Sequence, residues 1–140
     1  MTMTDAQDSL PPYPLRQIYF YLTQGCNLKC RHCWLAPKYQ DRDHTYPVLP
    51  VHLFSHIVRQ ARPLGLSGVK LTGGEPLMHP DISAILSVVR DSGLGLMIET
   101  NGLLFTRAMA EDIATCGDPL VSVSLDGVDA ITHERVRGVA

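Results

Sequence analysis

Short apolar segments alternate with amphipathic segments along this chain, and this alternation limits the possible folds more than any other feature of the sequence. The apolar runs are rich in aromatic, β-branched and aliphatic residues and end in turn-forming residues, as strands do. Strands that alternate with helices form a parallel sheet joined by right-handed crossovers. We therefore expect the order β-α-β-α-β-α-β, with strands at 16–23, 69–72, 94–100 and 120–125.

Capping and stop residues mark the expected helices. Pro50 can occupy the first position of a helix, and Thr106 is a candidate N-cap for a later one. Gly93 and Gly117 are expected to end the second and third helices. A further helix is expected to begin within 129–137. The apolar residues at helical spacing are Phe54, Ile57, Val58 and Ala61 in the first helix and Ile82, Ile85, Leu86 and Val89 in the second.

Each expected strand has one apolar side and one more polar side, because side chains alternate along a strand. A doubly wound sheet is covered on both sides and reads as apolar throughout. The pattern instead favours an α/β fold with a partial (β/α) barrel, in which helices cover the outside and polar side chains face a ligand-binding interior. The residues expected to face inward are Tyr21, Lys70, Thr72, Glu99, Asn101, Ser122, Ser124 and Asp126.

Charge and hydropathy exclude several classes of protein. The 140 residues contain 12 Lys and Arg against 14 Asp and Glu, a net charge of −2, which gives no reason to expect nucleic-acid binding. No apolar run reaches the length of a membrane span, and the polar start lacks the pattern of a secretory signal. We therefore expect a cytoplasmic protein without membrane contact, whose residues 1–15 form a flexible lead-in to one domain at 16–140.

Three cysteines lie close together in the loop after the first expected strand: Cys26, Cys30 and Cys33, spaced C-x3-C-x2-C. Without an export signal, a disulfide framework is a poor interpretation. Three thiolates can bind three irons of a four-iron cluster and leave the fourth iron open. The cysteines alone leave zinc, with His32 or another histidine as fourth ligand, as an alternative. The distant Cys116 is expected to be a small buried residue.

With its other motifs, the chain resembles the radical S-adenosylmethionine (radical SAM) superfamily over roughly residues 18–138. The resemblance rests on the cysteine loop together with three motifs that follow expected strands. The sequence around the cysteines and near the C-terminal end looks most like the SPASM-type branch, which modifies peptides or matures cofactors. The three motifs are Gly73-Gly74-Glu75-Pro76-Leu77, Glu99-Thr100-Asn101-Gly102 and Ser124-Leu125-Asp126-Gly127.

The resemblance implies roles for individual residues. Cys26, Cys30 and Cys33 would ligate a [4Fe-4S] cluster, and the amino and carboxylate groups of S-adenosylmethionine (SAM) would chelate its fourth iron. His32 stands where the family often has an aromatic residue near adenine. Further SAM contacts are implied for Gly73, Gly74 and Glu75 at the amino group and for Asn101, Ser122 and Ser124 at the ribose or carboxylate.

The resemblance also implies the reaction and the partners. One electron, from a donor of the flavodoxin or ferredoxin type, enters the cluster and cleaves SAM to methionine and a 5′-deoxyadenosyl radical. That radical abstracts a hydrogen atom from the substrate, for which a peptide or a cofactor precursor is expected. The protein orients the cofactor and excludes side reactions. The sequence points to no separate catalytic side chain.

The length raises a second hypothesis. The family core has six βα units, and this chain has four expected strands, so two more units would need roughly 50 further residues. The domain would then be truncated at its C-terminal side, and a split chain could bind the cluster without turning over substrate alone. The unpaired edge of the fourth strand would need self-association or a partner chain to cover it. A zinc-binding module is the third hypothesis.

Overall fold

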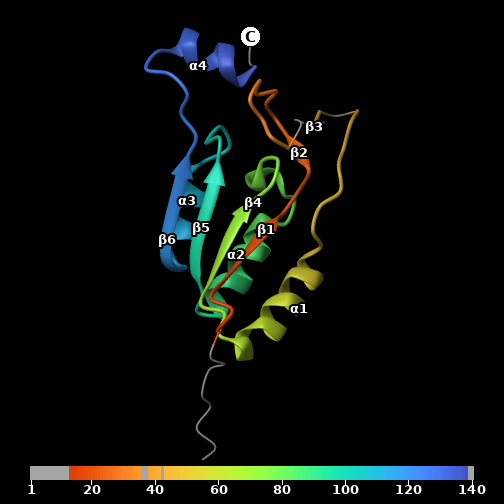
Figure 1. Cartoon of the computed structure of the whole chain (residues 1–140), viewed down its shortest axis with the longest axis vertical. Helices are drawn as coiled ribbons and strands as arrows, with labels where there is room; N and C mark the ends of the chain where they lie inside the picture. The colour runs from red at the N-terminus through yellow and green to blue at the C-terminus, as the bar shows by residue number, and fades with distance from the viewer. Residues whose placement is uncertain (1–12, 36–37, 42, 139–140) are drawn as a thin grey trace, which may run out of the picture.

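Four parallel strands form the centre of the structure, a computed structural model that describes residues 13–35, 38–41 and 43–138 (Figure 1). Their spatial order is the same as their order along the chain. Right-handed crossovers between such strands place every connecting helix on the same face, so the sheet is singly wound, as in a barrel. The strands are β1 (Gln17–Tyr21), β4 (Gly68–Thr72), β5 (Gly95–Thr100) and β6 (Gly117–Val123).

Three helices cover one face of this sheet: α1 (Val51–Ala61), α2 (Ile82–Asp91) and α3 (Arg107–Ala114) (Figure 1). Their apolar stripes pack against every second residue of the strands, which is the apolar parity that the sequence predicts. Phe54 of α1 packs on Phe20 of β1 with ring centroids 4.5 Å apart. The fully buried side chains of this core include Phe54, Val69, Leu71, Ile85, Leu86, Val89 and Ile98.

Capping residues fix where the later helices begin and end. The Thr106 hydroxyl accepts a hydrogen bond from the Met109 amide (3.2 Å), as expected for an N-cap. Gly93 follows α2 with a φ of 61°. The Asp129 carboxylate accepts from the Thr132 amide (2.8 Å) and begins α4 (Ala130–Arg137). The Thr132 hydroxyl donates to the same carboxylate (3.1 Å), and the two hydrogen bonds from Thr132 lower the pKa of Asp129. The expected fourth helix is therefore present.

The boundaries of the last strand and of the helix before it were predicted incorrectly. α3 ends at Ala114 with Thr115 as its C-cap, and Gly117 already belongs to β6, where it pairs with Gly95 of β5. The strand ends at Val123, so Leu125 lies beyond it. A register shift between Gly95 and Met97 accompanies this early start. A charged Asp-Pro pair at the beginning of the strand concealed it in the sequence.

The sequence also missed several short elements. Before α1, β3 (Lys38–Tyr39) pairs with β2 (Gly25–Cys26). The first strand is shorter than expected, because Thr23 forms an isolated bridge with Val48 instead. Two 3-10 turns, η1 (Arg62–Leu64) and η2 (Pro76–Met78), follow α1 and β4. Most of the expected lead-in, residues 1–12, lies outside the described residues.

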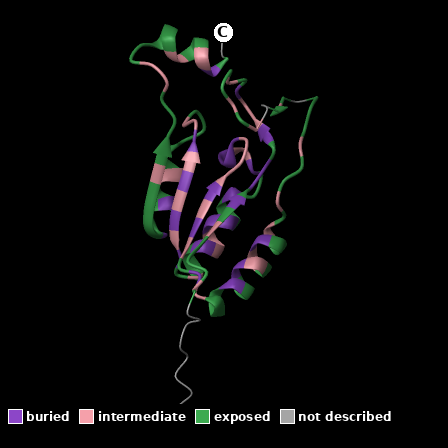
Figure 2. Ribbon diagram, in the orientation of Figure 1, coloured by how far each residue is buried: buried purple, intermediate pink, exposed green. Residues whose placement is uncertain are grey.

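The sheet face opposite the helices carries the polar parity. On this face, Tyr21 of β1 pairs with Thr72 of β4, and Glu99 of β5 pairs with Ser122 of β6. Glu99 accepts a hydrogen bond from Lys70 (2.6 Å) and another from Thr72 (3.2 Å), and the first of these raises the pKa of Lys70. The sheet is not closed into a barrel in the described residues, and β6 is largely exposed (Figure 2). This is the partial (β/α) barrel that the sequence predicts.

The described residues include no helix long and apolar enough to cross a membrane.

Candidate cofactor site

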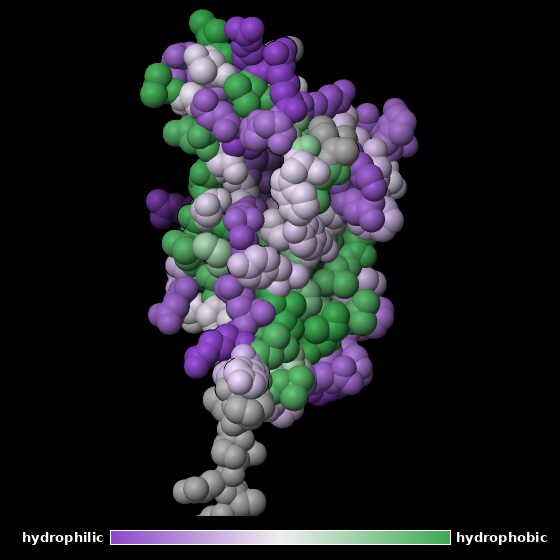
Figure 3. All heavy atoms as spheres, viewed as in Figure 1, coloured by the Kyte–Doolittle hydropathy of each residue, from purple (hydrophilic) through white to green (hydrophobic). Residues whose placement is uncertain are grey.

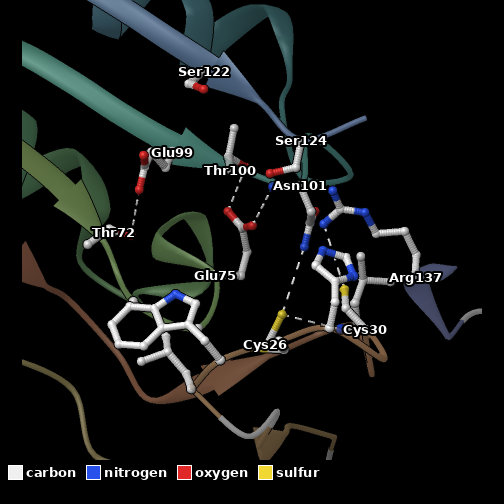
Figure 4. Close-up of a pocket in the computed structure, with 17 residues that line it drawn as sticks. Cys26, Cys30, Thr72, Glu75, Glu99, Thr100, Asn101, Ser122, Ser124 and Arg137 are labelled. Atoms are coloured by element: carbon white, nitrogen blue, oxygen red, sulfur yellow. Dashed lines mark hydrogen bonds between the residues drawn. The ribbon is translucent and has the colours of Figure 1, made fainter. Parts of the chain in front are cut away.

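A cavity of about 280 Å³ opens where the carboxyl ends of the strands meet the cysteine loop, residues 22–33, which follow β1. Its volume is near the lower end of the roughly 300–1,000 Å³ typical of small-molecule sites. The carboxyl ends of barrel strands are where such folds place their ligands. The lining residues include Cys26, Cys30, His32, Cys33, Gly73, Gly74, Glu75, Asn101, Ser122, Ser124 and Arg137 (Figure 4). All ten residues expected from the sequence therefore line a single cavity.

The glycine turn after β4 lies directly on the cysteine loop. The Gly74 amide donates to the Thr23 carbonyl (2.8 Å), and the Glu75 amide donates to the Gly25 carbonyl (2.9 Å). Gly73 has a φ of 132°, which side chains rarely adopt. A Cβ atom on Gly74 would overlap the Gly25 carbonyl oxygen. Glycine is thus required here so that two backbone segments can touch.

The Glu75 carboxylate is buried between this turn and the end of β5. It is 1% exposed and accepts three hydrogen bonds, from the Thr100 hydroxyl (2.7 Å) and from the amides of Asn101 (2.9 Å) and Leu77 (3.1 Å) (Figure 4). Both carboxylate oxygens are occupied. Glu75 therefore ties the glycine turn to β5, and its expected contact with the amino group of SAM stays a prediction.

The three loop cysteines are free, half-buried thiols that face the same cavity. Burial raises the pKa of Cys26, while the Leu28 amide, 3.4 Å from its sulfur, opposes that shift. Within the described ranges, no three His, Cys, Asp or Glu side chains are placed to hold one metal ion. Three thiols that line one cavity fit a cluster, in which each cysteine binds its own iron.

Polar groups surround the cysteines on the sheet side. The Asn101 side-chain amide donates to Asn27 (2.7 Å) and lies 4.0 Å from the Cys26 sulfur. The Ser124 amide donates to the Thr100 carbonyl (3.0 Å), which holds the chain after β6 against β5. His32 points across the cavity mouth, 3.8 Å from the Asp126 carboxylate. This mixture of thiols, close backbone and polar side chains fits a cluster together with a polar organic ligand.

Sequence reasoning missed two residues of this site. Thr100 is 3% exposed and holds Glu75 in place, and Asn27 connects the cysteine loop to Asn101. Thr100 could have been found, because it is polar at the position where the parity of β5 requires an apolar residue, in line with Leu96 and Ile98. A buried polar side chain needs a partner. No comparable signal marks Asn27.

These features define an α/β protein with a cluster-binding loop at the carboxyl edge of a singly wound parallel sheet. The model of the radical SAM superfamily matches residues 20–140. This chain therefore belongs to the radical SAM superfamily, whose members are enzymes that use a [4Fe-4S] cluster and SAM.

Curated relatives agree with this assignment. The chain is 36% identical over 126 residues to an AdoMet-dependent heme synthase of Methanosarcina barkeri, covering 89% of this chain and 35% of that protein. It is 34% identical over 143 residues to a GTP 3′,8-cyclase of a Synechococcus species, covering 98% of this chain and 40% of that protein. The chain spans about a third of the length of the curated relatives it matches.

A solved structure resembles the fold as well. SuiB of Streptococcus suis bound to S-adenosylmethionine superposes with a TM-score of 0.73 at 27% identity, over 89% of this chain and 28% of SuiB. SuiB bound to its precursor peptide SuiA superposes with a TM-score of 0.74 at 27% identity, over 92% of this chain and 28% of SuiB.

The fourth cysteine should react differently from the loop cysteines. Cys116 is 6% exposed, and burial raises its pKa. Because reactivity depends on access to the thiol as well as on its thiolate fraction, and the loop cysteines are partly exposed, we expect iodoacetamide at pH 8 to modify Cys116 at least about tenfold more slowly than the three loop cysteines. Burial also raises the pKa of Cys26, so Cys26 should be the slowest of those three. Peptide mass mapping of the apo chain measures this. A Cys116→Ala variant should keep three reactive thiols, and modification of Cys116 at the rate of the others would contradict its burial.

Proposed function

We propose that this chain binds a [4Fe-4S] cluster through Cys26, Cys30 and Cys33 and uses it with SAM for hydrogen abstraction from a substrate. The single observation that supports this most is that the three thiols and the Gly73-Gly74 turn line the same cavity, joined through backbone hydrogen bonds. Bound there, the cluster and SAM supply reductive cleavage of SAM and the radical that abstracts hydrogen. The protein contributes placement and exclusion of water.

Each group of residues in the cavity would have its own role in holding the cluster and SAM. The cysteine loop would hold three irons, and the glycine turn would let the amino group of SAM approach the backbone. Asn101, Ser122 and Ser124 would donate to the ribose or carboxylate from the ends of β5 and β6. His32, half-exposed at the mouth, would pack near adenine. Glu75 supports these contacts by fixing the glycine turn.

The substrate that we propose is a peptide or a cofactor precursor. A peptide substrate is supported by the likeness to SuiB, which binds its precursor peptide. A cofactor precursor is supported by the likeness to a heme synthase. The electron would come from a flavodoxin-type or ferredoxin-type donor, and the open sheet face, which carries Tyr21, Lys70 and Glu99, would face the substrate.

Anaerobic reconstitution tests this proposal. The purified chain is incubated with iron and sulfide, and iron per chain is measured together with release of 5′-deoxyadenosine from SAM under a strong reductant. We expect about four irons per chain, as a cubane requires, and deoxyadenosine above the background without protein. The triple variant Cys26→Ala/Cys30→Ala/Cys33→Ala should lose both, while the matched control Cys116→Ala should keep both.

The outcomes separate the hypotheses. Four irons without deoxyadenosine would favour the alternative of a truncated or split chain that binds the cluster without independent catalysis. Stoichiometric zinc with no iron uptake would overturn both and favour the zinc module. Iron uptake that survives in the triple variant would show that the cluster lies elsewhere.

A further inference from the structure

Helix α4 lies apart from the sheet, at the end of the molecule where the cysteine loop is found (Figure 1). Hydrophilic side chains are numerous at this end (Figure 3). Within α4, every residue of which is described, Arg137 alone is buried, while Ile131 is 81% exposed. Apolar burial therefore does not explain why the helix docks where it does. Specific polar and backbone contacts must therefore position it, and its last turn makes those to the cysteine loop.

The last turn of α4 contacts the cysteine loop through backbone and side chain. The Arg31 amide donates to the Val136 carbonyl (3.0 Å). The backbone of Gly138, with a φ of 69°, packs so closely on Lys29 that a Cβ atom there would overlap the Lys29 carbonyl. These contacts bring the Arg137 side chain to the cavity beside Cys30 (Figure 4).

The guanidinium of Arg137 reaches the sulfur of Cys30. Its Nη1 atom lies 3.7 Å from the Cys30 sulfur, and its Nε atom faces the Asp126 carboxylate as an ion pair. The residue is 7% exposed. Among the described residues, neither Arg137 Nε nor Asp126 Oδ2 makes a hydrogen bond of regular geometry, although both atoms are buried. A buried guanidinium only partly satisfied by protein groups has capacity left for more negative charge.

We propose that Arg137 is a positioning residue that donates to the Cys30 thiolate and thereby raises the reduction potential of the cluster held by the loop. This rests on the proposed function, since it requires the cluster. Arginine stays charged at any working pH, and hydrogen bonds to cluster sulfurs shift the potential. Reduction adds one negative charge close to this buried cation, so the cation favours the reduced form. The Asp126 carboxylate beside it opposes the effect.

This role differs from a contact between Arg137 and the SAM carboxylate. A SAM contact acts only when SAM is present and leaves the potential of the SAM-free cluster unchanged. A contact to the Cys30 sulfur acts without SAM. The two partners of the ion pair also have opposite expected effects, because removing a cation and removing an anion move a reduction potential in opposite directions. A merely structural role would move both variants alike.

The test is a redox titration of the anaerobically reconstituted full chain without SAM, followed by electron paramagnetic resonance of the reduced cluster. For Arg137→Gln we expect about a tenfold lower ratio of reduced to oxidised cluster at the wild-type midpoint, which is a shift of about −59 mV for one electron. Arg137→Lys should be intermediate. Asp126→Asn should shift the midpoint to more positive values. The matched control is Arg135→Gln, which removes the same charge from an exposed position of α4 and should leave the ratio within about twofold.

Several results would overturn the proposal. One is an unchanged midpoint in Arg137→Gln at full iron content, with or without weakened SAM binding. Another is a negative shift in Asp126→Asn. If the Arg137→Gln variant takes up no iron, the other two variants test the proposal. It then requires a midpoint shifted to more negative values in Arg137→Lys and to more positive values in Asp126→Asn. If the wild-type chain itself binds no iron, the proposed function fails, and the titration is not reached.

Discussion

Replacing Glu75 by alanine is expected to lower the free energy of unfolding by about 3–5 kcal/mol, because several donors would lose their acceptor. The carboxylate accepts hydrogen bonds from Leu77, Thr100 and Asn101, and it is 1% exposed. Alanine would leave the buried donors of Leu77 and Thr100 and the partly buried Asn101 amide without partners. Each buried donor without a partner costs about 1–3 kcal/mol. Denaturation by guanidinium chloride, followed by circular dichroism, measures the loss.

A graded pair of variants checks the origin of this effect. Glu75→Gln keeps the shape but places an NH₂ group against at least one donor, so it should cost about half as much. Glu111→Gln removes the charge of an exposed glutamate on α3 and should change stability by less than about 0.5 kcal/mol. A loss below about 1 kcal/mol for Glu75→Ala would mean that the carboxylate is dispensable to the fold and free for SAM.

Much of the fold could be predicted because the same physical pattern is repeated in each βα unit. Parity in β4 and β5 gives the buried face directly, since Val69, Leu71, Leu96 and Ile98 are all fully or almost fully buried. Helix starts followed from side chains that cap, as Thr106 does. β6 was misplaced because its pairing depends on a register shift beside Gly95, which is a tertiary feature that local sequence does not encode.

The site was predictable where chemistry restricts the residue type and not where the partner is distant in sequence. Cysteine thiols and consecutive glycines have few other uses in such a pattern, so their positions were identified. The assignment of Glu75 to SAM stays a prediction, and the sequence did not indicate the three protein donors that its carboxylate accepts from. The docking of α4 on the cysteine loop joins Arg137 to Cys30. Nothing in a local pattern indicates a contact between residues so far apart in the chain.

Replacing Gly74 by alanine is expected to cost about 3 kcal/mol of stability, the upper part of the range for overpacking a rigid site. An added Cβ would lie 2.5 Å from the Gly25 carbonyl carbon and 2.7 Å from the Gln24 oxygen, and closer still to the Gly25 oxygen. These are backbone atoms, which cannot rotate away. The glycine turn would therefore separate from the cysteine loop, and the Gly74 to Thr23 hydrogen bond would break.

The matched control is Gly93→Ala, because it separates the cost of contact from the cost of backbone conformation. Gly93 has a φ of 61°, and an added Cβ would meet nothing within 4 Å. The Gly93→Ala substitution should therefore cost about 1–2 kcal/mol of stability, as an alanine in the left-handed conformation does.

The affinity of the reconstituted chain for SAM, measured by calorimetry, should fall at least about tenfold for Gly74→Ala, because a loop displaced by about 1 Å no longer matches the ligand. Gly93 lies after α2, away from the cavity lining, so its variant should bind SAM normally. Equal losses of stability and unchanged SAM affinity in both variants would show that contact between the glycine turn and the cysteine loop is not what positions the site.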